Sequence, residues 1–268
     1  MAELVFLKLG GSLITDKART QTPRPDVIAR CAAEIAAAWG AGVRLLVGHG
    51  SGSFGHAEAR RFGTRQGVRT PDEWYGFARV ADVARRLNCL VVQALLQAGL
   101  PAVAVSPSAS AVARAGELAR LDGAVVRGLL ERGALPVVHG DVALDEEWGG
   151  TIVSTEQVLI HLTPALRPQR LVLAGEVAGV FSADPGLDPA ATLLPRVSAG
   201  NYDEVLRHLG GARGADVTGG MADKVRRMYR LAEANPGLLV HLVGGLTPGC
   251  LQRALLGQAA GEGTVIAP

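Results

Sequence analysis

Aromatic residues are scarce in this sequence: phenylalanine, tryptophan and tyrosine make up only 4% of its 268 residues. Aliphatic side chains must therefore fill the core, and a hydrophobic fraction of 48% is enough for a large one. Charge is scarce as well, at 19% of residues, and the net charge is only +2. With no basic run and no aromatic ladder, the sequence gives no reason to expect a nucleic-acid partner.

Cysteine and long apolar segments are also limited. Cys31, Cys89 and Cys250 lie far apart without CxxC spacing, so we expect three buried, reduced thiols. The N-terminus carries no basic segment followed by a long apolar stretch, and apolar runs such as Leu90–Leu96 are too short to span a bilayer. We therefore expect a cytoplasmic protein with no membrane partner.

Several familiar catalytic motifs are missing from the sequence. It contains no GxxxxGK[ST] phosphate loop, no GxSxG nucleophile elbow and no HExxH metal motif. Five of the six histidines lack metal-ligand spacing and are interpreted as structural; these are His49, His139, His161, His208 and His241. We therefore assign no metal site to protein side chains, and turn to glycine, which is abundant at 35 residues.

Strand-like and helix-like segments alternate along the chain. Apolar runs predict strands at 4–9, 43–47, 101–105, 135–139, 170–174, 238–243 and 264–266, with a hairpin over 142–153. Helical spacing predicts helices at 25–39, 71–98, 122–132, 201–209, 221–234 and after Pro248, and Ser154 with Gln157 predicts a capping box. This alternation predicts a single α/β domain, with a mostly parallel central sheet between two helical layers. Ligands of such sheets bind beyond the carboxyl ends of the strands, where the glycine clusters fall.

The first glycine cluster follows the first predicted strand. Lys8 lies near the end of this apolar strand, where a buried cation is costly unless an anion pairs with it. Gly10 and Gly11 would let backbone N–H groups approach a phosphate, and Lys17 adds a second cation. This pattern indicates a phosphate site.

The second cluster runs from Gly48 to His56 and follows the second predicted strand. We interpret it as a loop that His56 ends, with the imidazole placed to donate a hydrogen bond to a phosphate oxygen. The cluster also contains a formal GxGxxG match, which leaves a dinucleotide-binding oxidoreductase as an alternative. Against this alternative, the match follows the second strand, and no acidic residue ends a following strand.

The third cluster opens a predicted helix near the C-terminus. Gly219 and Gly220 lead into the helix start, which offers N–H groups and a positive dipole end. We place Lys224 in the first turn, where a cation is unfavourable unless an anion lies nearby. That position again indicates a phosphate.

Together, the segments KLGGSLITDK, GSGSFGH and DVTGGMADKV resemble the isopentenyl phosphate kinase family of the amino acid kinase superfamily, over nearly the whole chain. The resemblance implies that the protein uses ATP and Mg²⁺ to convert isopentenyl phosphate into isopentenyl diphosphate. It implies a homodimer, an acceptor-binding N-terminal lobe over about 1–165 and a nucleotide-binding C-terminal lobe over about 166–268.

The resemblance also implies roles for individual residues. The catalytic residues would be Lys8, Lys17 and His56. The acceptor would contact Gly50, Gly55, His56, Asp141 and Thr155. The nucleotide would contact Lys8, Gly10, Gly11, Ser12, Ser51, Asp184, Gly220 and Lys224.

The sequence departs from the family pattern at three places. Ser51 stands where the family usually has glycine, Glu156 where it has aspartate, and Gly175-Glu176 where it has Thr-Asp. In the family the aspartate orients lysines at the phosphates, so the longer reach of Glu156 leaves that role open. Two further alternatives also stay open, a fosfomycin-type kinase and a non-catalytic protein that binds ATP or an oxyanion. An apolar acceptor tail would need a hydrophobic pocket, and the candidates to line it are Trp74, Tyr75, Phe77 and Val80. The same residues could instead be helix core or dimer contacts.

Overall fold

The computed structural model describes residues 3–183, 185–210 and 220–268. Eight strands of this part form one large sheet, in the order β10-β12-β11-β9-β1-β2-β6-β3. Neighbouring strands are parallel except β11 and β12, which confirms the predicted mostly parallel sheet. The strands are β1 (Leu4–Leu9), β2 (Arg44–His49), β3 (Ala102–Ala104), β6 (Leu135–His139), β9 (Arg170–Gly175), β10 (Arg196–Val197), β11 (Leu239–Gly244) and β12 (Thr264–Ile266).

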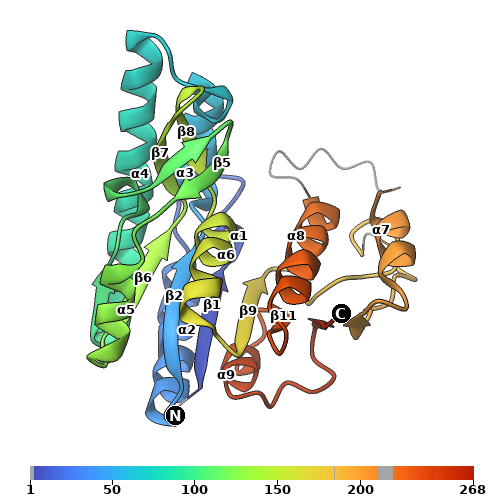
Figure 1. Ribbon diagram of the computed structural model, residues 1–268. Helices are drawn as coiled ribbons and strands as arrows, with labels where there is room; N and C mark the ends of the chain where they lie inside the picture. The colour runs from blue at the N-terminus through green and yellow to red at the C-terminus, as the bar shows by residue number, and fades with distance from the viewer. Residues whose placement is uncertain (1–2, 184, 211–219) are drawn as a thin grey trace.

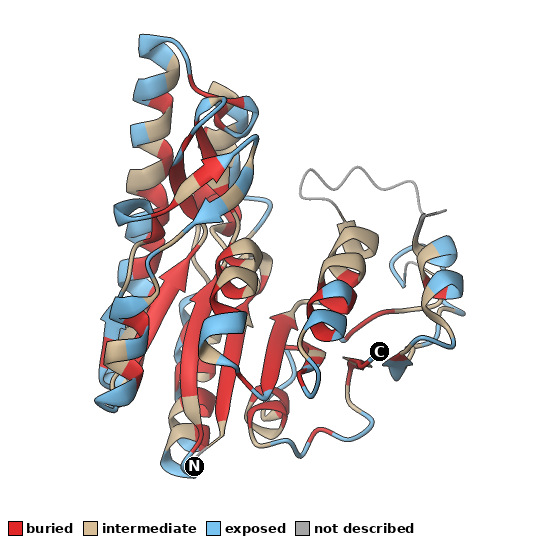
Figure 2. Cartoon of the chain, viewed as in Figure 1, coloured by how far each residue is buried: buried red, intermediate tan, exposed pale blue. Residues whose placement is uncertain are grey.

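Helices cover both faces of this sheet, as the sequence predicts (Figure 1). One face packs against α2 (Pro25–Gly40), α4 (Pro71–Gln97) and α9 (Cys250–Leu255). The other packs against α5 (Ala124–Glu131), α6 (Thr155–Leu166), α7 (Tyr202–Gly210) and α8 (Gly220–Ala234). Figure 2 shows the middle strands of the large sheet, β1, β2, β6 and β9, as the most deeply buried layer.

Alternation along β1 decides which side of the sheet Lys8 faces. Val5, Leu7 and Leu9 belong to the core on the α2 and α4 side, whereas Leu4 and Phe6 belong to the core on the α6 and α8 side. Successive side chains of a strand point to opposite faces, so Lys8 shares the face of Leu4 and Phe6. The only charged residue of this strand therefore faces α6.

A second, smaller sheet has the order β5-β4-β7-β8. Its strands are β4 (Val112–Arg114), β5 (Glu117–Arg120), β7 (Asp141–Asp145) and β8 (Gly149–Val153). The predicted hairpin over 142–153 is confirmed as β7 and β8, while β4 and β5 were not expected because they are short and mostly exposed. Only Gly140 separates β6 from β7, so this sheet extends from the carboxyl end of β6 (Figure 1).

The chain after β1 and after β2 is more helical than expected. The structure forms α3 (Gly52–Phe62) after β2, where we predicted a loop reaching His56, and a short α1 (Gly11–Ile14) one residue after β1. The glycines at 52 and 55 hide the helix from a sequence pattern, since glycine is a poor helix former. Two short 3₁₀ turns, η1 (Thr64–Gln66) and η2 (Pro107–Ala109), complete the described elements.

Cys31 and Cys250 are buried as expected, but Cys89 is exposed, so that part of the cysteine prediction is wrong. Cys89 lies on the outer side of α4, whose apolar residues extend beyond its core-facing side to exposed positions such as Leu90 and Leu96. None of the described helices combines the length and the apolar character needed to cross a bilayer.

Candidate active site

The first two glycine loops touch each other at the carboxyl edge of the large sheet. β1 and β2 are parallel neighbours with Leu9 aligned to His49, so both loops leave the sheet at one level. A Cβ placed on Gly11 would lie 2.7 Å from Gly52 Cα, and one on Gly50 would lie 2.9 Å from Gly11 N. Such distances are too short for any side chain, so glycine is required where the loops meet.

Hydrogen bonds hold the same two loops in place. The Thr15 hydroxyl donates to the Gly11 carbonyl at 2.7 Å and accepts from the Ser53 N–H at 2.9 Å. Thr15 and Ser53 are both buried. The loop after β1 is therefore fixed to the start of α3 before any ligand binds.

Lys8 reaches the start of α6. Its ammonium donates to a carboxylate oxygen of Glu156, and the two side chains keep only 13% and 19% of their surface exposed. Gly48 lies beside Lys8 in the sheet, and a Cβ there would come within 2.7 Å of Thr155 Cγ2. The absence of a side chain at position 48 thus lets α6 begin directly over β1 and β2.

The position of Glu156 is set by its neighbours on α6. The predicted capping box is present, because Ser154 accepts from the Gln157 N–H at 3.2 Å and Gln157 accepts from the Ser154 N–H at 2.7 Å. The buried Thr155 hydroxyl donates to the His49 carbonyl at 2.7 Å. The helix start is therefore tied to the end of β2, with Glu156 facing Lys8.

Lys224, on α8, acts on the same carboxylate. Burial alone would raise the pKa of Glu156, but the charges of Lys8 and Lys224 and the Lys8 hydrogen bond hold it below its ordinary value of 4.5. Glu156 is therefore ionised at neutral pH. Since α8 begins at Gly220, Lys224 lies in the second helical turn rather than the first. The charges of Lys8 and Lys224, one from the first and one from the third predicted segment, thus both act on Glu156.

A second carboxylate joins another pair of cations nearby. Glu176, which follows β9, lies 2.9 Å from Arg24 and 3.9 Å from Lys17. Gly10 donates to the Ala174 carbonyl at 2.7 Å, so the ends of β1 and β9 are in direct contact. Arg24 was not among the predicted site residues, since its only local signal is its place before Pro25, the first residue of α2.

The predicted acceptor residues occupy different environments. His56 is exposed on α3, and Gly55 packs against the Ser51 side chain. Asp141 is buried at 3% exposure, where its carboxylate accepts from the Ser108 N–H at 3.1 Å and the Val142 N–H at 2.9 Å.

Among the predicted nucleotide residues, Ser12 is half-buried in α1, Gly220 has a φ of +63° at the start of α8, and Asp184 lies outside the described residues. Gly220 therefore adopts a left-handed conformation that other residues rarely take.

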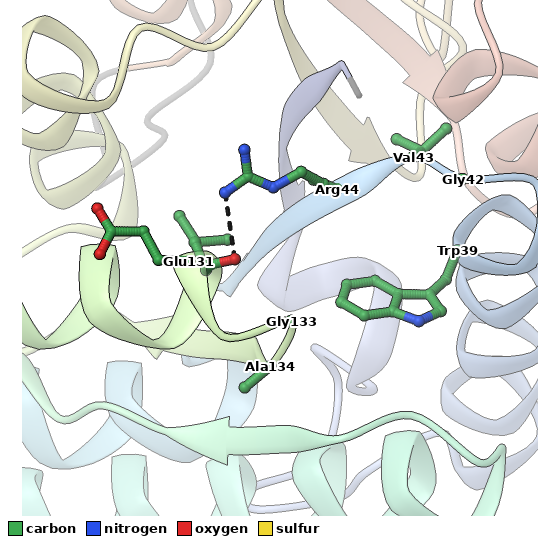
Figure 3. A pocket seen from close by; sticks show the side chains of 8 residues that line it. Trp39, Gly42, Val43, Arg44, Glu131, Gly133 and Ala134 are labelled. Carbon is green, nitrogen blue, oxygen red and sulfur yellow. Dashed lines mark hydrogen bonds between the residues drawn. The ribbon is translucent and has the colours of Figure 1, made fainter. Parts of the chain in front are cut away.

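A cavity of about 520 Å³ lies at the opposite end of the sheet (Figure 3). Trp39, Arg44 and Glu131 are among its lining residues, and Arg44 donates to the Leu130 carbonyl at 3.1 Å. β2 begins at Arg44, so this cavity lies at the amino ends of the strands. It is separate from the glycine loops, which lie at the carboxyl ends where ligands of such sheets bind.

Comparisons with known proteins place this chain among kinases. The model of the "Amino acid kinase family" matches residues 3–241. An isopentenyl phosphate kinase of Methanothermobacter thermautotrophicus is 36% identical over 95% of this chain and 96% of its own length. An isopentenyl phosphate kinase of Haloferax volcanii is 35% identical over 93% of this chain and 98% of its own.

The chain belongs to the isopentenyl phosphate kinases of the amino acid kinase family. Solved structures support this membership. One isopentenyl phosphate kinase structure superposes with a TM-score of 0.84 at 33% identity, covering 98% of this chain and all of the other. A structure described as an isopentenyl phosphate kinase substrate complex superposes with a TM-score of 0.78 at 27% identity, covering 98% and 99%. Membership of this kinase family is inconsistent with the dinucleotide-binding interpretation of the second loop.

Proposed function

We propose that this protein transfers the γ-phosphoryl group of ATP to isopentenyl phosphate, giving isopentenyl diphosphate and ADP. The observation that carries the proposal is the Lys8–Glu156 ion pair at the carboxyl edge of the sheet, where the charge of Lys224 acts on the same carboxylate. The relatives and solved structures named above act on isopentenyl phosphate by their descriptions, and they cover nearly the whole chain.

In this proposal the two cation pairs bind the phosphates. Lys8 pairs with Glu156, whose pKa the charge of Lys224 also lowers, and Lys17 and Arg24 share Glu176, so each group keeps one net positive charge. Phosphoryl transfer needs mainly positioning and neutralisation of the charge that develops on the transferred group. The carboxylates hold the cations in place, and the excess positive charge is left for the phosphates.

The donor set fits a magnesium ion that arrives with the nucleotide. Among the described residues, no three His, Cys, Asp or Glu side chains lie together as a metal site. Mg²⁺ is often bound through substrate phosphates, retained waters and only one or two carboxylates, and it would neutralise phosphate charge. Glu156, which pairs with Lys8, and Glu176, which lies 3.9 Å from Lys17, are carboxylates that could supply such a ligand.

The acceptor phosphate is proposed to bind on the second loop. His56 would donate to it from α3, where its exposure leaves it accessible to a ligand, and Gly50 and Gly55 would allow close approach. Asp141 and Thr155 remain proposed acceptor contacts. For the apolar tail, Val80 is buried in the core while Trp74 is 39% exposed and contacts Phe77, with ring centroids 5.1 Å apart.

This proposal extends to the architecture and location of the protein. Residues 1–165 would bind the acceptor and 166–268 the nucleotide. A cytoplasmic homodimer is proposed, supported by the exposed apolar side chains Leu90, Leu96 and Val103 on α4 and on β3, the strand at one end of the large sheet. An apolar surface at a sheet edge suits association with a second copy.

The experiment that tests the function is a coupled ADP-release assay across a panel of acceptors. We expect turnover with isopentenyl phosphate and Mg-ATP, well above that with fosfomycin or acidic amino acids. Turnover with fosfomycin alone would show that the protein is a kinase whose acceptor is not isopentenyl phosphate. Nucleotide binding without ADP release on any acceptor would favour the non-catalytic alternative.

A further inference from the structure

A bidentate ion pair links α8 to the smaller sheet. The Arg227 guanidinium donates to both carboxylate oxygens of Glu117, at 3.0 and 3.2 Å. Its Nε donates to Asp223 at 2.9 Å, one turn earlier on α8. Arg227 is thereby held by its own helix and by β5 at once, in a fork geometry that fixes direction as well as distance.

Glu117 is held in turn by α6. The Gln157 side-chain amide donates to Glu117 at 2.8 Å and to the Gly116 carbonyl at 3.1 Å. Gln157 directly follows Glu156, the partner of Lys8. The ion pair therefore connects α8 to the same helix start that carries the phosphate-site carboxylate.

Lys224 and Arg227 lie three residues apart on α8, a spacing that places both on one side of a helix. Two adjacent residues of α6 thus engage this side of α8. Glu156 interacts with Lys224, and Gln157 acts on Arg227 through Glu117. Fixing Arg227 therefore fixes the rotation and position of the helix that carries Lys224.

The charges of the pair support a persistent contact. The hydrogen bond from Arg227 lowers the pKa of Glu117; the Gln157 hydrogen bond acts in the same direction, and burial opposes both. The Arg227–Glu117 bond also raises the pKa of Arg227. Glu117 nevertheless keeps 62% of its side chain exposed. Exposed ion pairs contribute little to the free energy of unfolding, so stabilisation alone does not account for this bidentate geometry.

We propose that Arg227 and Glu117 are positioning residues that hold Lys224 at the nucleotide phosphates. The inference rests on the proposed kinase function in that it takes the ligand of Lys224 to be ATP. Neither residue is assigned to touch the nucleotide. Loss of their contact would let α8 shift and would weaken nucleotide binding.

The test compares Arg227→Gln, Glu117→Gln and the double variant with the wild-type protein. We expect each single variant to raise the KM for ATP about fivefold, the effect of an ion pair of this class. The KM for isopentenyl phosphate should stay within about twofold, because the acceptor does not contact α8 in this account. Arg227→Lys, which keeps the charge but loses the fork, should give an intermediate KM for ATP.

Two controls separate positioning from general damage. Arg226→Gln removes the neighbouring cation, which pairs with Asp223 at 3.4 Å, and should leave the KM for ATP unchanged. The double variant should be no worse than the poorer single variant, since residues acting through one contact are not additive. Additive effects, or an unchanged KM for ATP in Arg227→Gln, would overturn the proposal.

Binding of a non-hydrolysable ATP analogue distinguishes this inference from the proposed function. A weaker analogue Kd in Arg227→Gln, with an unchanged unfolding temperature, supports positioning even if isopentenyl phosphate proves not to be the acceptor. An unchanged Kd with a lowered unfolding temperature would show that the pair serves only stability.

Discussion

Lys8 donates a hydrogen bond to Glu156, and this contact joins β1, one of the two middle strands of the sheet, to the first turn of α6. The same carboxylate lies in the field of Lys224 from α8. Glutamate stands here at the position where the sequence resemblance leads us to expect an aspartate, and it pairs with Lys8 from that position. The departure in the sequence therefore retains the expected charge contact.

Glu156→Gln should lower kcat, because the two lysines lose the charge that orients them at the phosphates. We expect a loss of about tenfold to a hundredfold, comparable to small misplacements of catalytic groups. Glu156→Asp keeps the charge and should retain more activity than the glutamine variant. Equal activity of wild type and Glu156→Gln in the ADP-release assay would show that the carboxylate has no such role.

The same variant predicts a pH dependence of stability. Since the folded-state pKa of Glu156 lies below 4.5, its ionised form stabilises the fold above that pH. The contribution is lost as pH falls through the lowered folded-state pKa. The difference in unfolding free energy between wild type and Glu156→Gln should be constant above about pH 5 and shrink in acid. A difference that grows in acid would contradict the assigned direction.

His56→Ala should slow turnover about a hundredfold to a thousandfold, since removing one donor to developing charge costs ~3–4 kcal/mol of barrier. The measurement is kcat with isopentenyl phosphate at saturating ATP. His208→Ala, at an exposed histidine of α7, is the matched control and should behave as wild type. Near-normal turnover of His56→Ala would remove this histidine from the mechanism.

Gly11→Ala should damage the site through backbone crowding. The added Cβ would meet backbone atoms of Gly52, which cannot rotate away as a side chain could. Overpacking of this kind costs about 1–3 kcal/mol, measured by denaturant unfolding. Gly40→Ala is the control, because a Cβ there meets nothing within 4 Å. Equal unfolding free energies for the two variants would contradict the close approach of the loops.

His49 predicts a second pH dependence. Burial, together with the charge of His139, lowers the pKa of His49 from 6.5 to about 4, against the opposing effect of its hydrogen bonds to the Asn88 and Gly50 oxygens. The neutral ring therefore stabilises the fold fully above pH 6.5, and this contribution is lost as pH falls toward 4. Over that window wild type should lose about 3 kcal/mol that His49→Gln does not lose. Parallel unfolding curves for the two proteins would disprove the shift.

The elements that a single sequence predicts well here are those with strong local patterns. β1, β6 and β12 were predicted at their observed bounds, because the apolar run of a buried strand is locally distinct. The capping box at Ser154 was equally readable. The strands β4 and β5 were missed, since they are short and largely exposed, and α3 was missed because its glycines resemble a loop.

Some site residues could likewise be predicted from the sequence and others could not. Lys8, Gly11 and Lys224 could be selected because a lysine in an apolar strand, a paired glycine and a cation near a helix start are locally unusual. Arg24 and the Arg227–Glu117 pair could not, since a surface charge carries no local sign of a partner more than a hundred residues away. The Arg24 contact exists only because the segment before α2 packs near the end of β9, and the Arg227–Glu117 contact only because α8 packs against the smaller sheet.

The most direct test of the account follows the phosphorus product by ³¹P NMR, with isopentenyl phosphate, Mg-ATP and either the wild-type protein or Lys8→Met. We expect the two coupled resonances of a diphosphate ester to appear with the wild type, and at least a hundredfold more slowly with the variant. Failure of the wild type to form the diphosphate, or equal rates for both proteins, would contradict it.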